Sequence, residues 1–355
     1  MRNVAGRGWR VLRGKRAGYR GVAPFPGLRL KSRPGLLPRL LPGLLLGLLA
    51  HLPPAWAIIP PPSFSCSFSV SAIDFGNVNV ITGAGINTSG SISISCKGGS
   101  AYNWVTICPN IEYGSGNPSA WNPRQMDSGG NKLNYNLYHP GTFTIWGSFL
   151  WAHSARPPVL RYRLDSSGRG NWTTTIDARI ASGQTAAAPG FYVSSFSGSD
   201  VKFDYRMGYS SSCALPDGTE SPPFQVRANV IAYCEVSATD IDFGTAGVLD
   251  ANVDSTGQIS VRCTNGTPYQ VKLNGGLAGA GSPDQRRMTK GSESVRYGIY
   301  RDSARTQGWG DQPGNVANGT GNGNAQVFTT YGRVFPQTTP SPGTYTDTVV
   351  VTVVY

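Results

Sequence analysis

The stretch Gly343–Tyr355, GTYTDTVVVTVVY, carries the plainest structural signal in this chain. Read with a period of two, an apolar face alternates with a threonine face, which is the pattern of a β-strand. The apolar face holds Tyr345, Val349, Val351, Val353 and Tyr355, and the other face holds Thr346, Thr348 and Thr352. An apolar strand left uncovered at the end of a sheet pairs with other chains. We therefore expect either an earlier segment or a partner to cover this strand.

The composition favours an all-β protein. Gly (46) and Pro (26) make up about a fifth of the 355 residues, and only 14% are charged. Thr, Ser, Val and Tyr are abundant, and no long helical period follows residue 57. The net charge of +12 comes from residues 1–39, which hold eleven Lys or Arg and no acid. Residues 58–355 hold 20 basic and 19 acidic residues, so the charge is no sign of nucleic-acid binding.

Residues 1–57 are typical of a signal peptide with an over-long basic leader. Leu40–Ala50 is an apolar core of eleven residues, which is too short to span a bilayer. It is followed by Ala55–Ala57, AWA, a small-x-small cleavage site. We expect a secreted mature chain, and a true start downstream of Met1 would account for the length of the leader. The alternative is an uncleaved interfacial anchor.

The rest of the chain contains two copies of one sequence pattern. CSFSVSAIDFG, from Cys66, matches CEVSATDIDFG, from Cys234, and a second cysteine follows after 30 and 29 residues. MDSGGNKLNYNLY matches MTKGSESVRYGIY, each is followed by WG, and QTAAAPGFY matches QTTPSPGTY. Two tandem domains explain these matches. We place the domains at 58–213 and 234–355, joined by 214–233.

The repeat also predicts the disulfides. Equivalent cysteines pair equivalently in the two copies, and each bond closes a loop of about 30 residues, worth about 3–4 kcal/mol. The two cysteines without a counterpart in the second copy are paired by elimination. The expected pairs are Cys66–Cys96, Cys234–Cys263 and Cys108–Cys213. No CxxC pair or metal-type histidine spacing occurs, so we expect no metal and no cofactor.

The early Cys followed by IDFG, the second Cys about 30 residues later, the WG and the QxxxxPGxY before a terminal apolar strand resemble the spore coat protein U domain family. That family includes the subunits of archaic chaperone–usher pili. The resemblance implies two tandem immunoglobulin-like β-sandwich domains of the pilin type, the second lacking its last strand. A periplasmic chaperone and then the donor strand of the adjacent pilus subunit, exchanged at the outer-membrane usher, would fill its groove. The acceptor groove strand would comprise Val349, Val351, Val353 and Tyr355.

A donor-like segment lies inside the chain itself. FQVRANVIAY, Phe224–Tyr233, directly precedes the second repeat and alternates apolar and polar residues. We expect it to complete the first domain in cis; the alternative is an ordinary first strand of the second domain. Its inward residues would be Phe224, Val226, Ala228, Val230 and Ala232. The mature N-terminus, IIPPPSFS, is short and holds three consecutive prolines that cannot donate ladder hydrogen bonds. A subunit that accepts a strand and offers none stands at one end of a fibre.

The first domain contains a candidate adhesive surface. GSFLWAH, Gly147–His153, is apolar where the second copy has the polar GDQPGN, and a further tryptophan lies among turn formers. We expect an apolar patch for abiotic or host surfaces, formed by Trp121, Phe149, Leu150 and Trp151. The alternative is that these residues pack around the extra disulfide.

Other residues of the first domain receive structural interpretations. We expect Trp104 and Trp146 in the core, because the first lies in a strand pattern and the second matches Trp309. A loose basic run is more typical of a solvated face than of an anion site. It comprises Arg156, Arg161, Arg163 and Arg169.

These expectations combine into a secreted fimbrial subunit, the tip adhesin of an archaic chaperone–usher pilus. It would be exported through the periplasm to the cell surface, where it would mediate surface attachment and biofilm formation. A structural spore-coat or extracellular-matrix protein is the first alternative, and neighbouring chaperone and usher genes would discriminate between the two. A secreted hydrolase is disfavoured, because the chain has no nucleophile elbow, no HExxH and no paired carboxylates. We expect neither enzymatic activity nor nucleic-acid binding.

Overall fold

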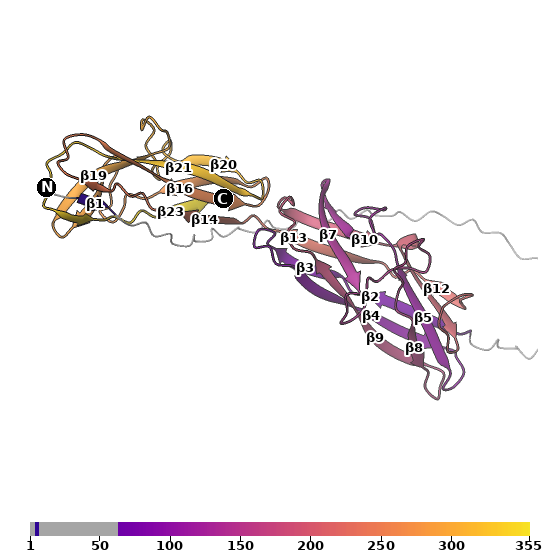
Figure 1. Cartoon of the computed structure of the whole chain (residues 1–355). Helices are drawn as coiled ribbons and strands as arrows, with labels where there is room; N and C mark the ends of the chain where they lie inside the picture. The colour runs from indigo at the N-terminus through magenta and orange to yellow at the C-terminus, as the bar shows by residue number, and fades with distance from the viewer. Residues whose placement is uncertain (1–3, 7–62) are drawn as a thin grey trace, which may run out of the picture. The chain divides into compact units, whose positions relative to one another are not determined.

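The computed structural model describes Val4–Gly6 and residues 63–355. Every regular element of these residues is a β-strand, apart from one short 3-10 turn, η1 (Gly198–Asp200), as Figure 1 shows. The all-β expectation is therefore confirmed. The expected signal peptide lies outside the described residues, except for the short strand β1 (Val4–Gly6).

The first domain contains two sheets around one hydrophobic core. The larger sheet contains, in spatial order, β2 (Ser65–Val70), β4 (Ile86–Lys97), β9 (Gly170–Ile180), β7 (Asn131–Tyr138), β6 (Arg124–Ser128), β10 (Gly190–Phe196), β13 (Phe224–Val230) and β3 (Ile73–Val78). The smaller sheet contains β12 (Gly218–Glu220), β11 (Val201–Met207), β5 (Trp104–Ile111) and β8 (Leu160–Arg163). Alternate side chains of both sheets meet in this core, as in an immunoglobulin-like sandwich.

The second domain has its own core and three sheets. The largest contains β14 (Cys234–Ala238), β16 (Val253–Cys263), β21 (Ala325–Val334), β19 (Glu293–Tyr300) and β18 (Arg286–Lys290). The second contains β20 (Ala317–Thr320), β17 (Pro268–Leu273) and β23 (Val351–Val354). The third contains β15 (Thr245–Ala246), β1 and β22 (Gly343–Tyr345).

The two domains share one strand order. In the first domain β2, β4, β9, β7 and β6 are neighbours in that order, and β14, β16, β21, β19 and β18 repeat it in the second. Likewise β5 lies between β11 and β8, and β17 lies between β23 and β20. The sequence repeat is therefore also a repeat of the fold.

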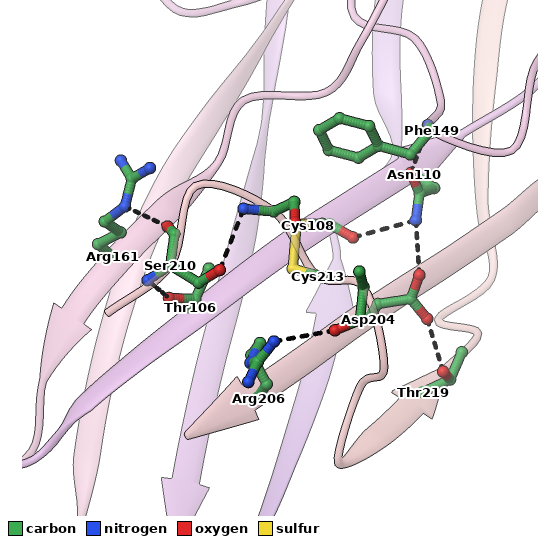
Figure 2. Close-up of a disulfide and its surroundings, with 12 residues drawn as sticks. Thr106, Cys108, Asn110, Phe149, Arg161, Asp204, Arg206, Ser210, Cys213 and Thr219 are labelled. Carbon is green, nitrogen blue, oxygen red and sulfur yellow. Dashed lines mark hydrogen bonds between the residues drawn. A yellow bond between two sulfur atoms is a disulfide. The ribbon is translucent and has the colours of Figure 1, made fainter. Parts of the chain in front are cut away.

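Three disulfides are present, and they coincide with the three pairs that the repeat predicts. The bond Cys66–Cys96 joins β2 to β4, and Cys234–Cys263 joins β14 to β16, each at directly opposite positions of the paired strands. The bond Cys108–Cys213 belongs to the first domain alone and ties β5 to the loop that follows β11 (Figure 2).

Each domain also buries an arginine beside the tryptophan of its WG segment. In the first domain the guanidinium of Arg124 donates to the backbone oxygens of Ile111 (2.9 Å), Glu112 (2.6 Å) and Trp146 (2.7 Å). The indole nitrogen of Trp146 in turn donates to the oxygen of Pro109 (2.8 Å). These bonds satisfy backbone groups at the end of β5 that would otherwise be buried without a partner. Burial lowers the pKa of Arg124 to about 10, so the side chain stays charged at neutral pH.

The second domain repeats this arrangement with Arg286. Its guanidinium donates to the backbone oxygens of Asn274 (2.9 Å) and Trp309 (2.8 Å). The indole nitrogen of Trp309 donates to the oxygen of Val271 (3.0 Å). Both tryptophans of the WG segments are buried, as expected. The two arginines lie two residues before the methionine of the repeated segment, so extending the sequence comparison by two residues would have found them.

The strand β13 completes the core of the first domain. It pairs antiparallel with β10 along seven positions, from Gly190–Val230 to Phe196–Phe224, and parallel with β3. Its inward residues are buried in the same cluster as the rest of the core; these are Phe224, Val226, Ala228 and Val230. The ring of Phe224 stacks on Phe196 at a centroid distance of 4.5 Å. On the outer face, Arg227 pairs with Asp74 (2.9 Å).

The expectation for Ala232 is wrong. The strand β13 ends at Val230, and Ala232 is exposed. The chain leaves the first domain here because Cys234 already belongs to β14, where it lies opposite Cys263. Segment 214–233 thus holds β12, which pairs with β11, as well as β13.

Replacing Arg124 by Met should lower the free energy of unfolding of the first domain by about 3 kcal/mol or more. The change leaves three carbonyl oxygens and the amide oxygen of Asn136 without their buried donor. Urea unfolding of the mature chain measures this loss. The control Arg169→Met alters an exposed arginine and should change the free energy by less than about 0.5 kcal/mol. Equal effects of the two variants would contradict the role given to Arg124.

Replacing Val226 by Asp should lower the melting temperature of the first domain by about 6–12 °C. An unpaired carboxylate in the core costs about 3 kcal/mol or more, and a domain of this size converts that cost into such a shift. The matched control is Gln225→Asp, one residue earlier on the exposed face of β13. Thermal unfolding followed by circular dichroism compares them, and a V226D protein as stable as Q225D would exclude β13 as a core strand.

Candidate functional site

The second domain has a strand position that corresponds to the one that β13 fills in the first. Its flanking strands are β15, at the end of the second IDFG segment, and β22, at the start of the second PGxY segment. Between them lies β1, which pairs parallel with β22 and antiparallel with β15. Both directions are opposite to those of β13. This position, here called the strand slot, therefore accepts backbone from a segment that is distant in the sequence.

An apolar pocket lies in the second domain beside the strand slot. It is lined by Phe243, Ala246, Leu249, Val253, Met288, Val295 and Val334. In the first domain the repeat places Phe75, Met126 and Leu133 at the positions of Phe243, Met288 and Val295. Those three residues share a core cluster with the inward side chains of β13. The second domain thus keeps the apolar lining, largely buried in its core, and a small pocket remains beside it.

The terminal stretch Gly343–Tyr355 is not one continuous strand. It is divided into β22 and β23, and β23 pairs antiparallel with β17. Of the expected groove residues, Val349, Val351 and Val353 are buried in the core of the second domain. The expectation for Tyr355 is wrong, because this residue lies beyond the end of β23 and is exposed.

Asp347 explains the interruption of this stretch. It is buried on the face expected to be apolar, and its carboxylate accepts hydrogen bonds from the backbone nitrogens of Leu277 (2.8 Å) and Thr348 (2.7 Å) and from the hydroxyl of Tyr297 (2.6 Å). Burial and the neighbouring carboxylate raise the pKa of Tyr297, which therefore stays protonated as the donor. These three hydrogen bonds hold Asp347 at the point where the chain passes from the sheet of β22 to the sheet of β23.

The expected adhesive residues divide into two pairs. Phe149 and Leu150 are exposed, by 40% and 54% of their surface. Trp151 is 5% exposed, so its placement on the surface was wrong, and Trp121 is half-buried. A tight turn directs Phe149 and Leu150 outward and Trp151 inward. The turn is held because the backbone nitrogen of Phe149 donates to Asn110 (2.8 Å) and that of Leu150 donates to the hydroxyl of Ser148 (3.0 Å).

The buried member of the turn belongs to an aromatic cluster, formed by Tyr113, Trp121, Trp151 and His153. The ring of Trp121 stacks on His153 at 4.6 Å, and Trp151 lies 5.2 Å from Tyr113. The guanidinium of Arg124 lies 5.0 Å from the ring of Trp151. Neither Tyr113 nor His153 was identified from the sequence, because no periodic pattern joins them to the tryptophans. The cluster supports the turn from below, so that Phe149 and Leu150 are held outward.

A half-buried carboxyl lies at the base of the same turn. Desolvation raises the pKa of Glu112, and a hydrogen bond from Ser148 (3.4 Å) partly offsets this effect. The apolar residues at the surface are therefore supported by polar groups.

Two further expectations for the first domain need revision. Trp104 is exposed rather than in the core, since it is the first residue of β5 and its ring contacts Tyr209 on the surface (5.3 Å). The basic run is not a uniformly solvated face. Arg156 donates to the backbone oxygen of Ser148 (3.1 Å), whereas Arg161 and Arg163 lie over tyrosine rings.

Two further features are absent from the part of the chain that the structure describes. It contains no helix long and apolar enough to cross a membrane. It also contains no group of three or more His, Cys, Asp or Glu residues placed to hold a metal ion.

Several solved structures are similar to this chain. One is a chain in the crystal structure of the CsuC–CsuE chaperone–tip adhesion subunit pre-assembly complex, from the archaic chaperone-usher Csu pili of Acinetobacter baumannii. It is 18% identical to this chain, the match covers 82% of this chain and 100% of that chain, and the TM-score is 0.45. The CupB6 tip adhesin from Pseudomonas aeruginosa is 12% identical, with 81% and 98% covered and a TM-score of 0.37. No curated protein matches the chain by sequence.

The sequence model of one family matches most of the chain in two tandem segments. The Spore Coat Protein U domain matches residues 60–197 and again residues 221–352. The chain therefore belongs to the Spore Coat Protein U domain family and contains this domain twice.

Proposed function

We propose that this chain is a fimbrial subunit, the tip adhesin of a chaperone–usher pilus, that adheres through its first domain and joins the fibre through its second. The observation that carries the proposal is the contrast between two equivalent strand positions. In the first domain β13 fills the position from within the chain, and its side chains lie in the core. In the second domain the same apolar lining borders a pocket. Such a domain obtains a complete core when a strand from another molecule is added.

The partners of the strand slot follow from this geometry and from the family resemblance. The donor strand of the adjacent subunit would enter between β15 and β22. The backbone of each of these two strands pairs with β1 in the structure. Before assembly, a periplasmic chaperone would cover the slot, and an outer-membrane usher would be the place of exchange. The protein would thus pass through the periplasm to the cell surface.

The tip position rests on how the donor-like segment is used. Within the part of the chain that the structure describes, FQVRANV of β13 is paired on both edges inside the first domain. A segment held in this way is not free to enter a neighbouring subunit. A subunit that uses its donor-like segment internally and accepts a strand at its second domain would end a fibre, with its first domain outward.

The adhesive surface would consist of the exposed pair Phe149 and Leu150. An apolar side chain transferred from water to an apolar surface gains about 1.5–3 kcal/mol when fully covered. A pair with about half of its surface exposed gains less, so a single contact is weak. Many fibres on one cell make such contacts together, which multiplies the strength of attachment. Surface attachment and biofilm formation would follow.

A structural coat or matrix protein is the alternative, which the name of the matched domain favours. Such a protein also needs a partner strand for its second domain, so the slot does not discriminate between the two. Genes for a chaperone and an usher beside this one would support the pilus.

The strand slot should bind a peptide with the sequence of β13. Because the two domains are repeats, FQVRANVIAY added to the mature chain should raise the unfolding temperature of the second domain. At a free concentration about a hundredfold above its Kd, the peptide adds about 2.7 kcal/mol of stability. Differential scanning calorimetry measures the shift, and a peptide with Asp at the positions of Val226 and Ala228 is the control. If both peptides shift the unfolding temperature equally, or if neither shifts it, the strand slot does not bind this sequence and the proposal is wrong.

Exchanging Phe149 and Leu150 for Ser should abolish attachment of fibres to hydrophobic plastic while the unfolding temperature changes little, because neither side chain fills the core. The control exchanges Val248 and Leu277 for Ser, two residues at least as exposed, in the second domain. Trp151→Ala should instead cost about 3–5 kcal/mol of stability, since it removes a buried ring. Normal attachment by the F149S/L150S double variant would place the adhesive surface elsewhere.

A further inference from the structure

Two neighbouring arginines of β8 lie over exposed tyrosine rings in the first domain. Arg161 lies 4.9 Å from the ring of Tyr209, which is 68% exposed, and Arg163 lies 5.6 Å from the ring of Tyr102, which is 57% exposed. The exposed Trp104 contacts Tyr209 edge to face at 5.3 Å. These five residues are here called the Arg–Tyr patch. Exposed Tyr, Trp and Arg together are the composition of energetically important contacts in protein interfaces.

Both guanidinium groups are oriented in the same way. The Nε of Arg161 donates to the backbone oxygen of Ser210 (2.6 Å), and the Nε of Arg163 donates to that of Tyr102 (3.0 Å). Their planes are further held by the rings beneath them. Neither arginine forms an ion pair with a carboxylate of the described residues. The terminal Nη edge of each group is thus left to an external acceptor.

The loop that carries Tyr209 is tied to β5 by the disulfide that only the first domain has. Cys213 is bonded to Cys108 of β5, and Figure 2 shows this bond beside the loop that follows β11. Thr106 binds that loop twice, by donating to the oxygen of Gly208 (2.7 Å) and accepting from the nitrogen of Ser210 (3.0 Å). A ring and a guanidinium held in advance lose little conformational entropy when a ligand binds.

The nearby carboxylates are satisfied by their own turns and strands. Asp165, which follows β8, accepts hydrogen bonds from the backbone nitrogens of Ser167 (2.8 Å) and Arg169 (2.9 Å). Asp204 accepts from Asn110 (2.9 Å) and Thr219 (2.6 Å). Because these carboxylates are held by their own turns and strands, neither forms an ion pair with Arg161 or Arg163, and the Nη groups of the two arginines keep no carboxylate partner among the described residues.

We propose that the Arg–Tyr patch binds a carboxylate-bearing polysaccharide. Arg161 and Arg163 lie on the same face of β8, two residues and therefore about 6.6 Å apart. Each can present its planar Nη edge to one carboxylate of an acidic sugar. The free areas of Tyr209, Tyr102 and Trp104 can pack against the apolar faces of the sugar rings. This site is separate from Phe149 and Leu150 and goes beyond adhesion to apolar surfaces.

Nucleic acid fits the patch less well than an acidic sugar. Its binding requires many cations along a densely charged backbone, whereas residues 58–355 carry nearly balanced charges and the patch holds two arginines. Base stacking also requires open ring faces, and a guanidinium already covers one face of Tyr209 and of Tyr102.

The experiment measures binding of the full mature chain to immobilised polygalacturonate by surface plasmon resonance, with fully methyl-esterified polygalacturonate as the uncharged ligand of the same backbone. Wild type should bind the acid form and not the ester, and binding should weaken as salt is raised. Arg163→Gln and Tyr209→Ala should each weaken binding at least about fivefold, a loss within the range for a charge-assisted contact. Arg163→Lys should weaken it as well, because an ammonium keeps the charge but lacks the planar fork.

The matched control is Arg179→Gln. Arg179 lies over the exposed ring of Phe143 at 5.5 Å in the same domain, so the control removes the same charge from a similar pair outside the patch. It should bind as wild type does. The proposal is overturned if the acid form is not bound, if the ester binds equally, if R179Q loses as much as R163Q, or if single-stranded DNA binds as tightly with the same dependence on Arg163. Failure of adhesion by the fibre has no bearing on this result, because the assay uses the unassembled chain.

Discussion

The first domain depends on one strand, β13, that enters its sheet between β3 and β10. The strand β13 pairs with β10 on one side and with β3 on the other. Without it, the backbone groups of β3 and β10 that face β13 would have no partner. The same strand buries Phe224, Val226 and Val230 in the core. Each of these side chains contributes about 1.5–3 kcal/mol when removed from water, which is a large share of the stability of a domain. In the second domain the equivalent position holds β1, which comes from a segment distant in the sequence.

The buried arginines connect this core to the surface of the first domain. Where β5 ends and the WG segment begins, several carbonyl oxygens point inward, and a guanidinium can satisfy them because it carries five donors. Arg124 binds three such oxygens and also lies against the ring of Trp151. The turn that exposes Phe149 and Leu150 therefore rests on the same residue that closes the end of β5. In the second domain Arg286 makes the equivalent backbone bonds, but the loop after its WG is polar.

The sequence predicts the features that local patterns and the repeat encode. Alternation along Phe224–Val230 predicts a buried strand, and equivalent cysteines predict the disulfides. Both predictions need only the local sequence or the comparison of the two repeats. The direction of Trp151 is not encoded in this way. The direction of Trp151 follows from two hydrogen bonds of its turn. One is to Asn110, which is distant in the sequence, and the other is to the hydroxyl of Ser148, which a hydrophobic pattern does not reveal. Asp347 is similar, since a backbone nitrogen seventy residues earlier, that of Leu277, helps to hold its carboxylate inside.

The repeat also separates what the fold requires from what each copy adds. Strand order, the first disulfide and the buried arginine occur in both domains, so they serve the fold itself. The bond Cys108–Cys213, the aromatic cluster and the Arg–Tyr patch occur in the first copy alone, and all of them fix side chains at or near its surface. Ordering a loop costs conformational entropy that a core does not repay, because the loop buries little. The two binding surfaces proposed for the first domain would account for such ordering, since a surface that is held in place before a ligand arrives loses less entropy on binding.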